Sequence, residues 1–288
     1  MSHKDPCYES CAVRVAFAAA LLALALTGAA VRAAELALEG DFVQGGLIFG
    51  QAAPGAGVTL EGRNVRVTET GRFIFGFGRD APPNAVLEVV WPDGRVEMRH
   101  LVVAKRDYKI QRIDGLAPKM VTPPETVLAR IRAENARIAE ARALDRAEPL
   151  FESGFIWPVE GPITGVFGSQ RVLNGKPRRP HYGIDIAAPA GTPVRAPADG
   201  VVAIADDDMY YTGGTVLIDH GHGLTSVYSH MKEVWVTVGT RLSQGDAIGS
   251  VGASGRVTGA HLDWRINWFD QRLDPGLLVP PMPAPGTE

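Results

Sequence analysis

The chain contains very little cysteine: Cys7 and Cys11 are the only two in 288 residues. Both precede the first apolar run, Val15 to Leu26, so removal of that segment during export would leave no thiol. Thiol catalysis, disulfides and cysteine-bound metal are thereby excluded from the mature chain. Any metal site must be built from histidine and carboxylate side chains.

A strong net charge is also absent, because the formal net charge is −3 at pH 7. Nucleic-acid binding needs a basic face, so we expect no nucleic-acid partner. No second apolar stretch is long enough to span a bilayer, and we expect no stable membrane span in the mature form. With 45% hydrophobic residues, the composition also excludes collagen-like, disulfide-stapled and wholly disordered chains.

The first 34 residues have the pattern of a secretory signal peptide. Lys4 and Arg14 supply positive charge, an apolar run follows, and small residues extend to position 34. We expect cleavage after Ala33 or, as an alternative, after Ala30, and therefore an exported, periplasmic protein. An uncleaved N-terminal anchor is the other interpretation, because Val15 to Val31 has a length at the short edge of what spans a bilayer.

Residues 35–117 show short strands separated by turns, and we predict a small β-sandwich there. The runs Val86 to Trp91 and Val96 to Val103 flank Pro92-Asp93-Gly94, which is typical of a hairpin. Apolar and charged side chains alternate in the second run, as in a strand with one solvated face. The only histidine in the region is His100, so we expect a spacer or docking module without a catalytic centre.

A connecting α-helix is predicted over residues 122–148. Thr122-Pro123-Pro124-Glu125 offers a capping box with proline at the first helical position. Apolar residues then recur at helical spacing, and the arginine and glutamate residues between them indicate a solvated face.

Residues 155–278 return to strands and turns and contain five of the seven histidines. We predict an antiparallel β-sheet domain, which makes the fold class mainly β. Residues 279–288 are rich in proline and are expected to form a disordered tail. The candidate strands of the domain are Gly200 to Ala205, Thr215 to His220, Leu224 to His230 and Ala260 to Trp268.

Three segments of this region carry candidate chemistry. His181 and Asp185 are four apart, so in an extended segment they point the same way and offer the nitrogen and oxygen ligands that Zn²⁺ accepts. Strand alternation predicts that His230 shares a face with Tyr228. In the third segment the alternation is strict, which suits the floor of a site. Its polar face consists of His261, Asp263, Arg265 and Asn267.

Other polar residues have a structural interpretation. His220 and His222 flank a tight turn and are expected to be hydrogen-bonding residues. Asp206-Asp207-Asp208 lacks the glycine and distal glutamate of a calcium loop, so we expect a solvated loop.

Several motifs occur together between Trp157 and Pro275. They are His181-Tyr-Gly-Ile-Asp185, Ala196-Pro-Ala-Asp-Gly200, Tyr228-Ser-His-Met231 and Gly259-Ala-His-Leu262. This region resembles the lysostaphin-like, or LytM-type, zinc endopeptidases that cut peptidoglycan cross-bridges. The resemblance implies an antiparallel sheet domain of the duplicated hybrid motif type with a groove across it. It further implies zinc ligands at His181 and Asp185 and catalytic histidines at His230 and His261.

The sequence departs from that family at Asp263, where a second histidine of a His-x-His motif usually supplies the third zinc ligand. Asp263 can bind zinc itself, since a carboxylate is an acceptable ligand. A harder metal such as Mn²⁺ or Fe²⁺ is the second interpretation. The third is a site without metal, as in amidase-activating relatives, although these tend to lose several site residues together. We favour retained binding of one Zn²⁺ per chain by His181, Asp185 and Asp263.

The sequence therefore predicts a peptidoglycan-directed zinc metalloendopeptidase that hydrolyses peptide cross-links through a metal-activated water. Two carboxylates in the ligand set would make zinc a weaker Lewis acid, so we expect activity at higher pH than with His-x-His. The alternative is a catalytically degenerate cell-wall protein that binds peptidoglycan or activates an amidase, with another cell-wall hydrolase as its partner. A carbohydrate-binding structural module is a third interpretation.

Overall fold

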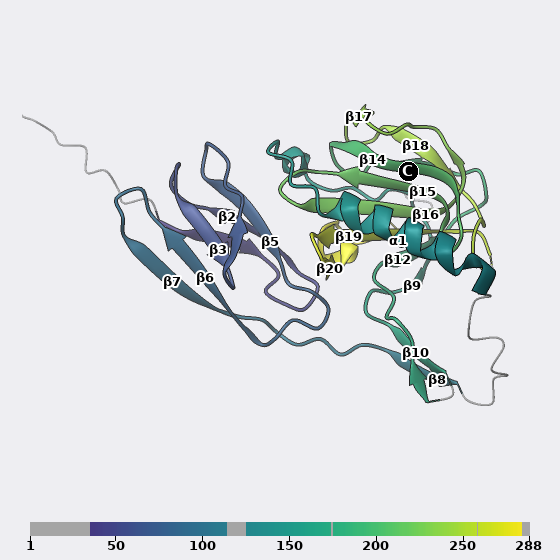
Figure 1. Ribbon diagram of the computed structural model, residues 1–288, viewed down its shortest axis with the longest axis horizontal. Helices are drawn as coiled ribbons and strands as arrows, with labels where there is room; N and C mark the ends of the chain where they lie inside the picture. The colour runs from purple at the N-terminus through teal and green to yellow at the C-terminus, as the bar shows by residue number, and fades with distance from the viewer. Residues whose placement is uncertain (1–34, 114–124, 174, 258, 284–288) are drawn as a thin grey trace, which may run out of the picture. The chain divides into compact units, whose positions relative to one another are not determined.

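The computed structural model describes residues 35–113, 125–173, 175–257 and 259–283 (Figure 1). These residues are mainly β, in predominantly antiparallel sheets with one α-helix, which confirms the predicted fold class. The predicted signal segment lies outside the described residues. Within them, no helix has both the length and the hydrophobicity needed to cross a membrane.

Two small antiparallel sheets make up the N-terminal part of the described chain. The first has the order β1 (Ala37–Gly40), β2 (Leu47–Gln51), β5 (Arg72–Gly76). The second has the order β4 (Arg63–Val65), β3 (Gly57–Leu60), β6 (Asn84–Val90), β7 (Val96–Val102). The predicted hairpin is present, because β6 and β7 pair antiparallel along their whole length.

Strand β5 is buried on both faces. Phe73 and Phe75 fill the space on one side, and Ile74 on the other side is only 1% exposed. Gly76 lies on the same side as Ile74, and a Cβ atom placed there would come within 2.6 Å of the Leu273 side chain. The glycine thus permits the close approach of β5 to the C-terminal part of the chain.

Strand β7 exposes three of its apolar side chains and buries Leu101. Val96, Met98 and Val102 are each more than half exposed. The alternate residue Glu97 is less exposed, because its carboxylate accepts hydrogen bonds from Trp91 Nε1 (3.2 Å) and Arg99 Nη2 (2.6 Å). The strand has one solvated face as predicted. This face consists of Val96, Met98, His100 and Val102.

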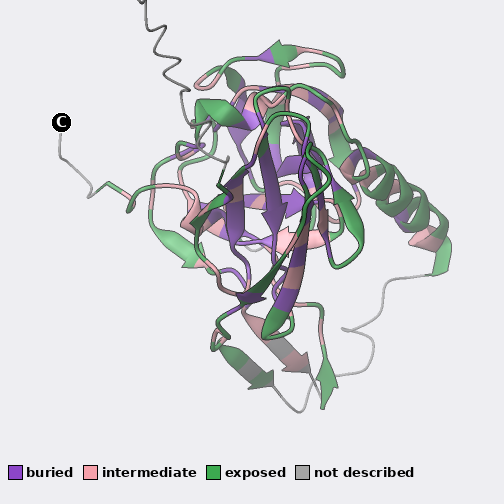
Figure 2. Cartoon of the chain, turned by 90° about the vertical axis from the view of Figure 1, so that its left-hand side faces the viewer, coloured by how far each residue is buried: buried purple, intermediate pink, exposed green. Residues whose placement is uncertain are grey.

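A ten-stranded sheet forms the C-terminal part. Its main path runs β17 (Arg241–Leu242), β14 (Gly200–Met209), β15 (Gly213–Asp219), β16 (Leu224–Val234), β19 (His261–Trp268), β12 (Ile184–Ala187), β9 (Ile163–Gly165). Off this path lie β13 (Pro193–Arg195), β18 (Ala247–Val251) and β20 (Gln271–Leu273). All four candidate strands are present, and Figure 2 shows buried strands at the centre of the molecule.

A third small sheet pairs β8 (Ile110–Ile113) in parallel with β10 (Gln170–Leu173), and β10 in turn pairs with β11 (Lys176–Pro177). Three short 3-10 turns complete the described elements. They are η2 (Glu125–Val127), η3 (Leu150–Ser153) and η4 (Pro275–Leu277).

Helix α1 spans Leu128–Arg142 and is shorter than the predicted 122–148. Its N-cap is Val127, which makes no side-chain capping hydrogen bond, and residues 122–124 of the expected capping box lie outside the described residues. Ala141 packs with Ile204 and Leu217, so the helix covers part of the sheet at β14 and β15.

The charged face of α1 explains the run of three aspartates. Arg137 Nη1 lies 2.8 Å from Asp206 Oδ2, and Arg130 Nη2 lies 3.2 Å from Asp208 Oδ2. Both aspartates belong to β14. The expectation of a solvated loop is therefore wrong, because the run continues a strand whose carboxylates pair with the helix.

The predicted tail is held in place over its first residues. Val279 and Met282 pack against the core, and the Pro280 carbonyl accepts a hydrogen bond from Trp157 Nε1 at 2.9 Å. Residues 284–288 lie outside the described residues.

Candidate metal centre

His181 is placed by the backbone immediately before β12. Its carbonyl accepts a hydrogen bond from Gly168 N, and its N–H donates to Ser169 O, both at 2.8 Å. Gly168 O in turn accepts from Arg79 Nε (3.0 Å) and Nη2 (2.8 Å), and Arg79 is 8% exposed. The segment that carries His181 is thus tied on one side to a buried arginine of the N-terminal part.

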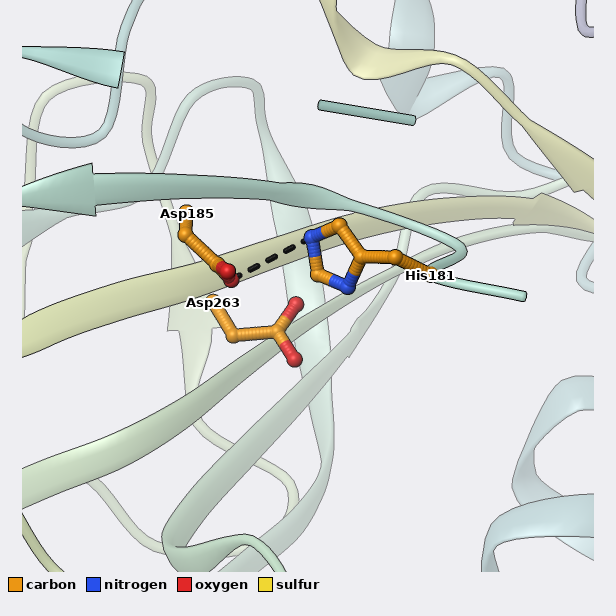
Figure 3. Close-up of side chains that lie close together, drawn as sticks. All are labelled: His181, Asp185 and Asp263. Atoms are coloured by element: carbon orange, nitrogen blue, oxygen red, sulfur yellow. Dashed lines mark ion pairs between the residues drawn. The ribbon is translucent and has the colours of Figure 1, made fainter. Parts of the chain in front are cut away.

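Asp185 and Asp263 lie opposite each other on β12 and β19. Asp185 Oδ1 is 3.2 Å from His181 Nε2 and 3.8 Å from His261 Nε2. One ligand atom from each of His181, Asp185 and Asp263 lies within 4.8 Å of the other two, and Figure 3 shows the three side chains converging. The structure therefore brings the predicted metal ligands together.

These three residues suit a divalent cation. His181 Nε2 is buried and makes no hydrogen bond to any described residue, although it faces Asp185. One imidazole nitrogen and two carboxylates form a donor set that Zn²⁺ accepts and that also suits Mn²⁺ or Fe²⁺. A buried imidazole nitrogen that makes no hydrogen bond and lies beside two carboxylates is a suitable ligand atom for such a cation.

Asp263 also makes an ion pair that the sequence analysis missed. Arg265 Nε donates to Oδ1 (2.9 Å) and Oδ2 (3.1 Å), and Nη2 contacts Oδ2 as well. Burial alone would raise the pKa of Asp263, but the charge and hydrogen bonds of Arg265 bring this pKa below its ordinary value. Strand alternation had placed both residues on one face, and that was the only available signal.

This ion pair bears on the expected pH dependence. The expectation of activity at higher pH rests on two carboxylates in the ligand set and stays a prediction. The structure adds the guanidinium of Arg265, whose positive charge offsets part of the negative charge of Asp263.

His230 and His261 lie side by side, with ring centroids 5.0 Å apart. His230 does not share a face with Tyr228, which is fully buried in the core. The backbone of His230 has φ = 68°, a left-handed conformation that interrupts the alternation and turns the side chain toward His261. The predicted shared face is therefore wrong, because the regular pairing of β16 with β19 ends one residue earlier, at Ser229.

Both histidines are oriented through Nδ1. His230 Nδ1 lies 2.9 Å from Ser254 O, and His261 Nδ1 lies 2.9 Å from Gly259 O. Because a carbonyl only accepts, Nδ1 of each ring carries a proton, and Nε2 is the nitrogen that remains for other partners. Burial lowers the pKa of His230, which favours its neutral form.

His220 and His222 have the structural roles that were expected. His220 Nδ1 lies 2.6 Å from Asp199 O and its Nε2 lies 2.7 Å from Ser226 Oγ. His222 Nε2 lies 3.0 Å from Ala147 O. Burial lowers the pKa of both imidazoles, so both are neutral packing residues.

Comparison with known proteins identifies the C-terminal region. Residues 179–275 match peptidase family M23. Cell division protein DipM of Caulobacter vibrioides is 30% identical over 169 residues, which cover 56% of this chain and 26% of DipM. DD-carboxypeptidase/endopeptidase Mpg of Neisseria meningitidis serogroup B is 40% identical over 105 residues, or 36% of this chain and 24% of Mpg. The chain thus spans about a quarter of the length of these curated relatives.

The similarity extends to a solved structure. A crystal structure from Pseudomonas aeruginosa assigned to peptidase M23 covers 82% of this chain and 94% of its own chain, with a TM-score of 0.63 and 29% identity. The resemblance to the lysostaphin-like, LytM-type family is confirmed for the C-terminal region.

Proposed function

We propose that this chain, whose residues 179–275 form a domain of peptidase family M23, is a metalloendopeptidase that hydrolyses peptide cross-links of peptidoglycan. The observation that carries the proposal is the convergence of His181, Asp185 and Asp263 within 4.8 Å, beside the paired rings of His230 and His261. The name of a further relative, peptidoglycan DD-endopeptidase ShyA of Vibrio cholerae, which is 41% identical over 87 residues, supports a peptide bond of peptidoglycan as the substrate. The signal-like N-terminus favours action in the periplasm.

His181, Asp185 and Asp263 would hold Zn²⁺, with Mn²⁺ or Fe²⁺ as alternatives. When bound, the ion supplies Lewis acidity toward the scissile carbonyl and lowers the pKa of water. His230 is neutral and presents Nε2, so it accepts the proton of the attacking water. With both ring nitrogens protonated, His261, whose Nε2 lies 3.8 Å from Asp185 Oδ1, would donate a hydrogen bond to the developing oxyanion or a proton to the leaving amine.

One observation favours a second candidate function. Both oxygens of Asp263 accept hydrogen bonds from Arg265, which reduces the capacity of this carboxylate to bind a cation. In that case the protein is a catalytically degenerate cell-wall protein that binds peptidoglycan or activates an amidase. Its partner would then be another cell-wall hydrolase.

Digestion of purified sacculi separates the two functions. The variants are His181→Ala and Asp263→Ala, and His100→Ala on β7 is the matched control outside the site. We expect the wild-type and His100→Ala proteins to release soluble fragments and to contain stoichiometric zinc, and His181→Ala to do neither. A wild-type protein that contains no metal and releases nothing would support the degenerate function instead.

A further inference from the structure

We propose that Arg265 competes with the divalent cation for Asp263 and thereby makes the site bind the cation more weakly than its three ligands would alone. The inference rests on the proposed function only in assuming that His181, Asp185 and Asp263 take a divalent cation. It assigns to Arg265 the role of a residue that sets metal affinity.

The geometry places Arg265 directly on the ligand. Arg265 follows Asp263 by two positions on β19, so both side chains leave the same face of the strand. The guanidinium bridges both carboxylate oxygens through Nε, at 2.9 and 3.1 Å, with Nη2 also on Oδ2. The Asp263 side chain is 3% exposed and that of Arg265 is 32% exposed, so the pair is shielded on the carboxylate side.

The charges of this cluster oppose each other. Asp185 and Asp263 carry two negative charges toward the position of the cation, and Arg265 cancels one of them. A guanidinium keeps its positive charge in proteins, so this cancellation is permanent. A divalent ion and a guanidinium that share one carboxylate repel each other, and the repulsion is strong because the site is only partly solvated.

The same contacts allow binding without excluding the ion. Each carboxylate oxygen has two lone pairs, so Asp263 retains acceptor capacity while it is paired with Arg265. The guanidinium of Arg265 and the divalent cation therefore compete for the carboxylate of Asp263. A purely orienting role for Arg265 predicts the opposite result, because removal of an orienting hydrogen bond weakens metal binding.

The direction of the change in zinc affinity therefore tests the inference. The metal-free protein is titrated with Zn²⁺ alone against a chromophoric chelator, without peptidoglycan. The variants are Arg265→Gln, which removes the charge, and Arg265→Lys, which keeps it. The matched control is Arg272→Gln, because Arg272 lies on the adjacent strand β20 and donates to the Asn267 amide instead of a ligand carboxylate.

We expect Arg265→Gln to lower the Kd for Zn²⁺ about tenfold, a change that one displaced charge can produce. Arg265→Lys and Arg272→Gln should stay within about threefold of the wild type. A higher or unchanged Kd in Arg265→Gln, or an equal decrease in Arg272→Gln, would overturn the inference. So would absence of zinc binding in both the wild type and Arg265→Gln.

A folding control accompanies the titration. Thermal unfolding in the presence of a chelator shows whether each variant is folded, and Arg265→Met replaces Arg265→Gln if that variant unfolds.

The zinc titration is independent of the proposed activity, because it contains no peptidoglycan. Tighter zinc binding by Arg265→Gln would support the inference even if the protein did not digest sacculi.

Discussion

Asp185 and Asp263 are direct cross-strand neighbours in the antiparallel pair β12–β19, so two carboxylates face the same position. Like charges directly opposite each other destabilise a sheet. Arg265 pairs with Asp263, while Asp185 lies within ion-pair distance of the imidazoles of His181 and His261. We therefore expect this pair of carboxylates to lower the stability of the fold.

We expect Asp185→Asn to stabilise the cation-free protein by about 0.5 kcal/mol, because it removes the repulsion between neighbouring carboxylates. Zinc should raise the melting temperature of the wild type and leave that of Asp185→Asn nearly unchanged. Thermal unfolding at pH 8, with a chelator and then with Zn²⁺, measures both effects. Asp207→Asn, at an exposed position of β14, is the control and should change neither. Lower stability of Asp185→Asn in the chelator would contradict the argument.

His230→Gln and His261→Gln should each reduce the rate of sacculus digestion by about 10²–10⁴, the usual contribution of a positioned proton-transfer group. Zinc content should stay at the wild-type level, since neither ring belongs to the converging ligand set. Metal analysis of the same preparations checks the second statement. Loss of zinc in His261→Gln would instead make this residue a ligand.

A buried hydrogen-bond chain links His220, Ser226 and Tyr228, and it predicts that two serines of β16 differ in their contribution to stability. Ser226 Oγ bonds both His220 Nε2 and Tyr228 Oη at 2.7 Å, so Ser226→Ala removes a hydrogen bond from two buried polar groups. We expect a loss of about 2–4 kcal/mol in the free energy of unfolding. Ser229 is equally buried, but its hydroxyl has no hydrogen-bond partner among the described residues. Ser229→Ala should therefore cost nothing, and equal losses in urea unfolding would refute the contrast.

Stability should fall as the pH drops below about 6.5. Burial lowers the pKa of His220 from its ordinary value of 6.5, so below that pH the unfolded chain binds a proton that the folded chain does not. His222 and His230 shift in the same direction. Each group can contribute up to about 1.4 kcal/mol per pH unit.

Urea unfolding at pH 7.5, 6.5 and 5.5 measures this dependence. The free energy of unfolding should change little above pH 7.5, and His220→Gln should make the decline shallower. Carboxylates with lowered pKa values, such as Asp263 and Asp206, act at lower pH, where they would add a further loss. A free energy that is constant between pH 7.5 and 5.5 would show that the buried histidines do not titrate as their burial implies.

The sequence was sufficient where a regular period governs the structure. Period-two alternation placed the strand that carries His261 and Asp263, and the four-residue spacing of His181 and Asp185 predicted their convergence. The period-two pattern failed at His230, because this residue has a left-handed backbone conformation. Such a residue interrupts the alternation of side chains between the two faces of the strand. No pattern of hydrophobicity reports such a local backbone conformation.

Other differences arise from tertiary contacts. Alternation put Arg265 on the site face, but only the packed structure shows its guanidinium on Asp263. On β7 the hydrogen bond from Trp91 to Glu97 helps to keep Glu97 less exposed than Val96 and Met98, which lie on the opposite face. The aspartate run on β14 looked like a loop because its partners, the arginines of α1, are far away in sequence.

The two hydrogen bonds from Arg79 to the Gly168 carbonyl determine how short a fragment containing this domain can be. Gly168 and Ser169 hold the backbone of His181 on one side, and both precede the region that matches the family. A fragment trimmed to residues 179–275 would therefore keep its histidines and carboxylates but lose the brace of one of them. A fragment that keeps the His181 backbone in place must therefore include Arg79 and the N-terminal sheets as well as residues 179–275.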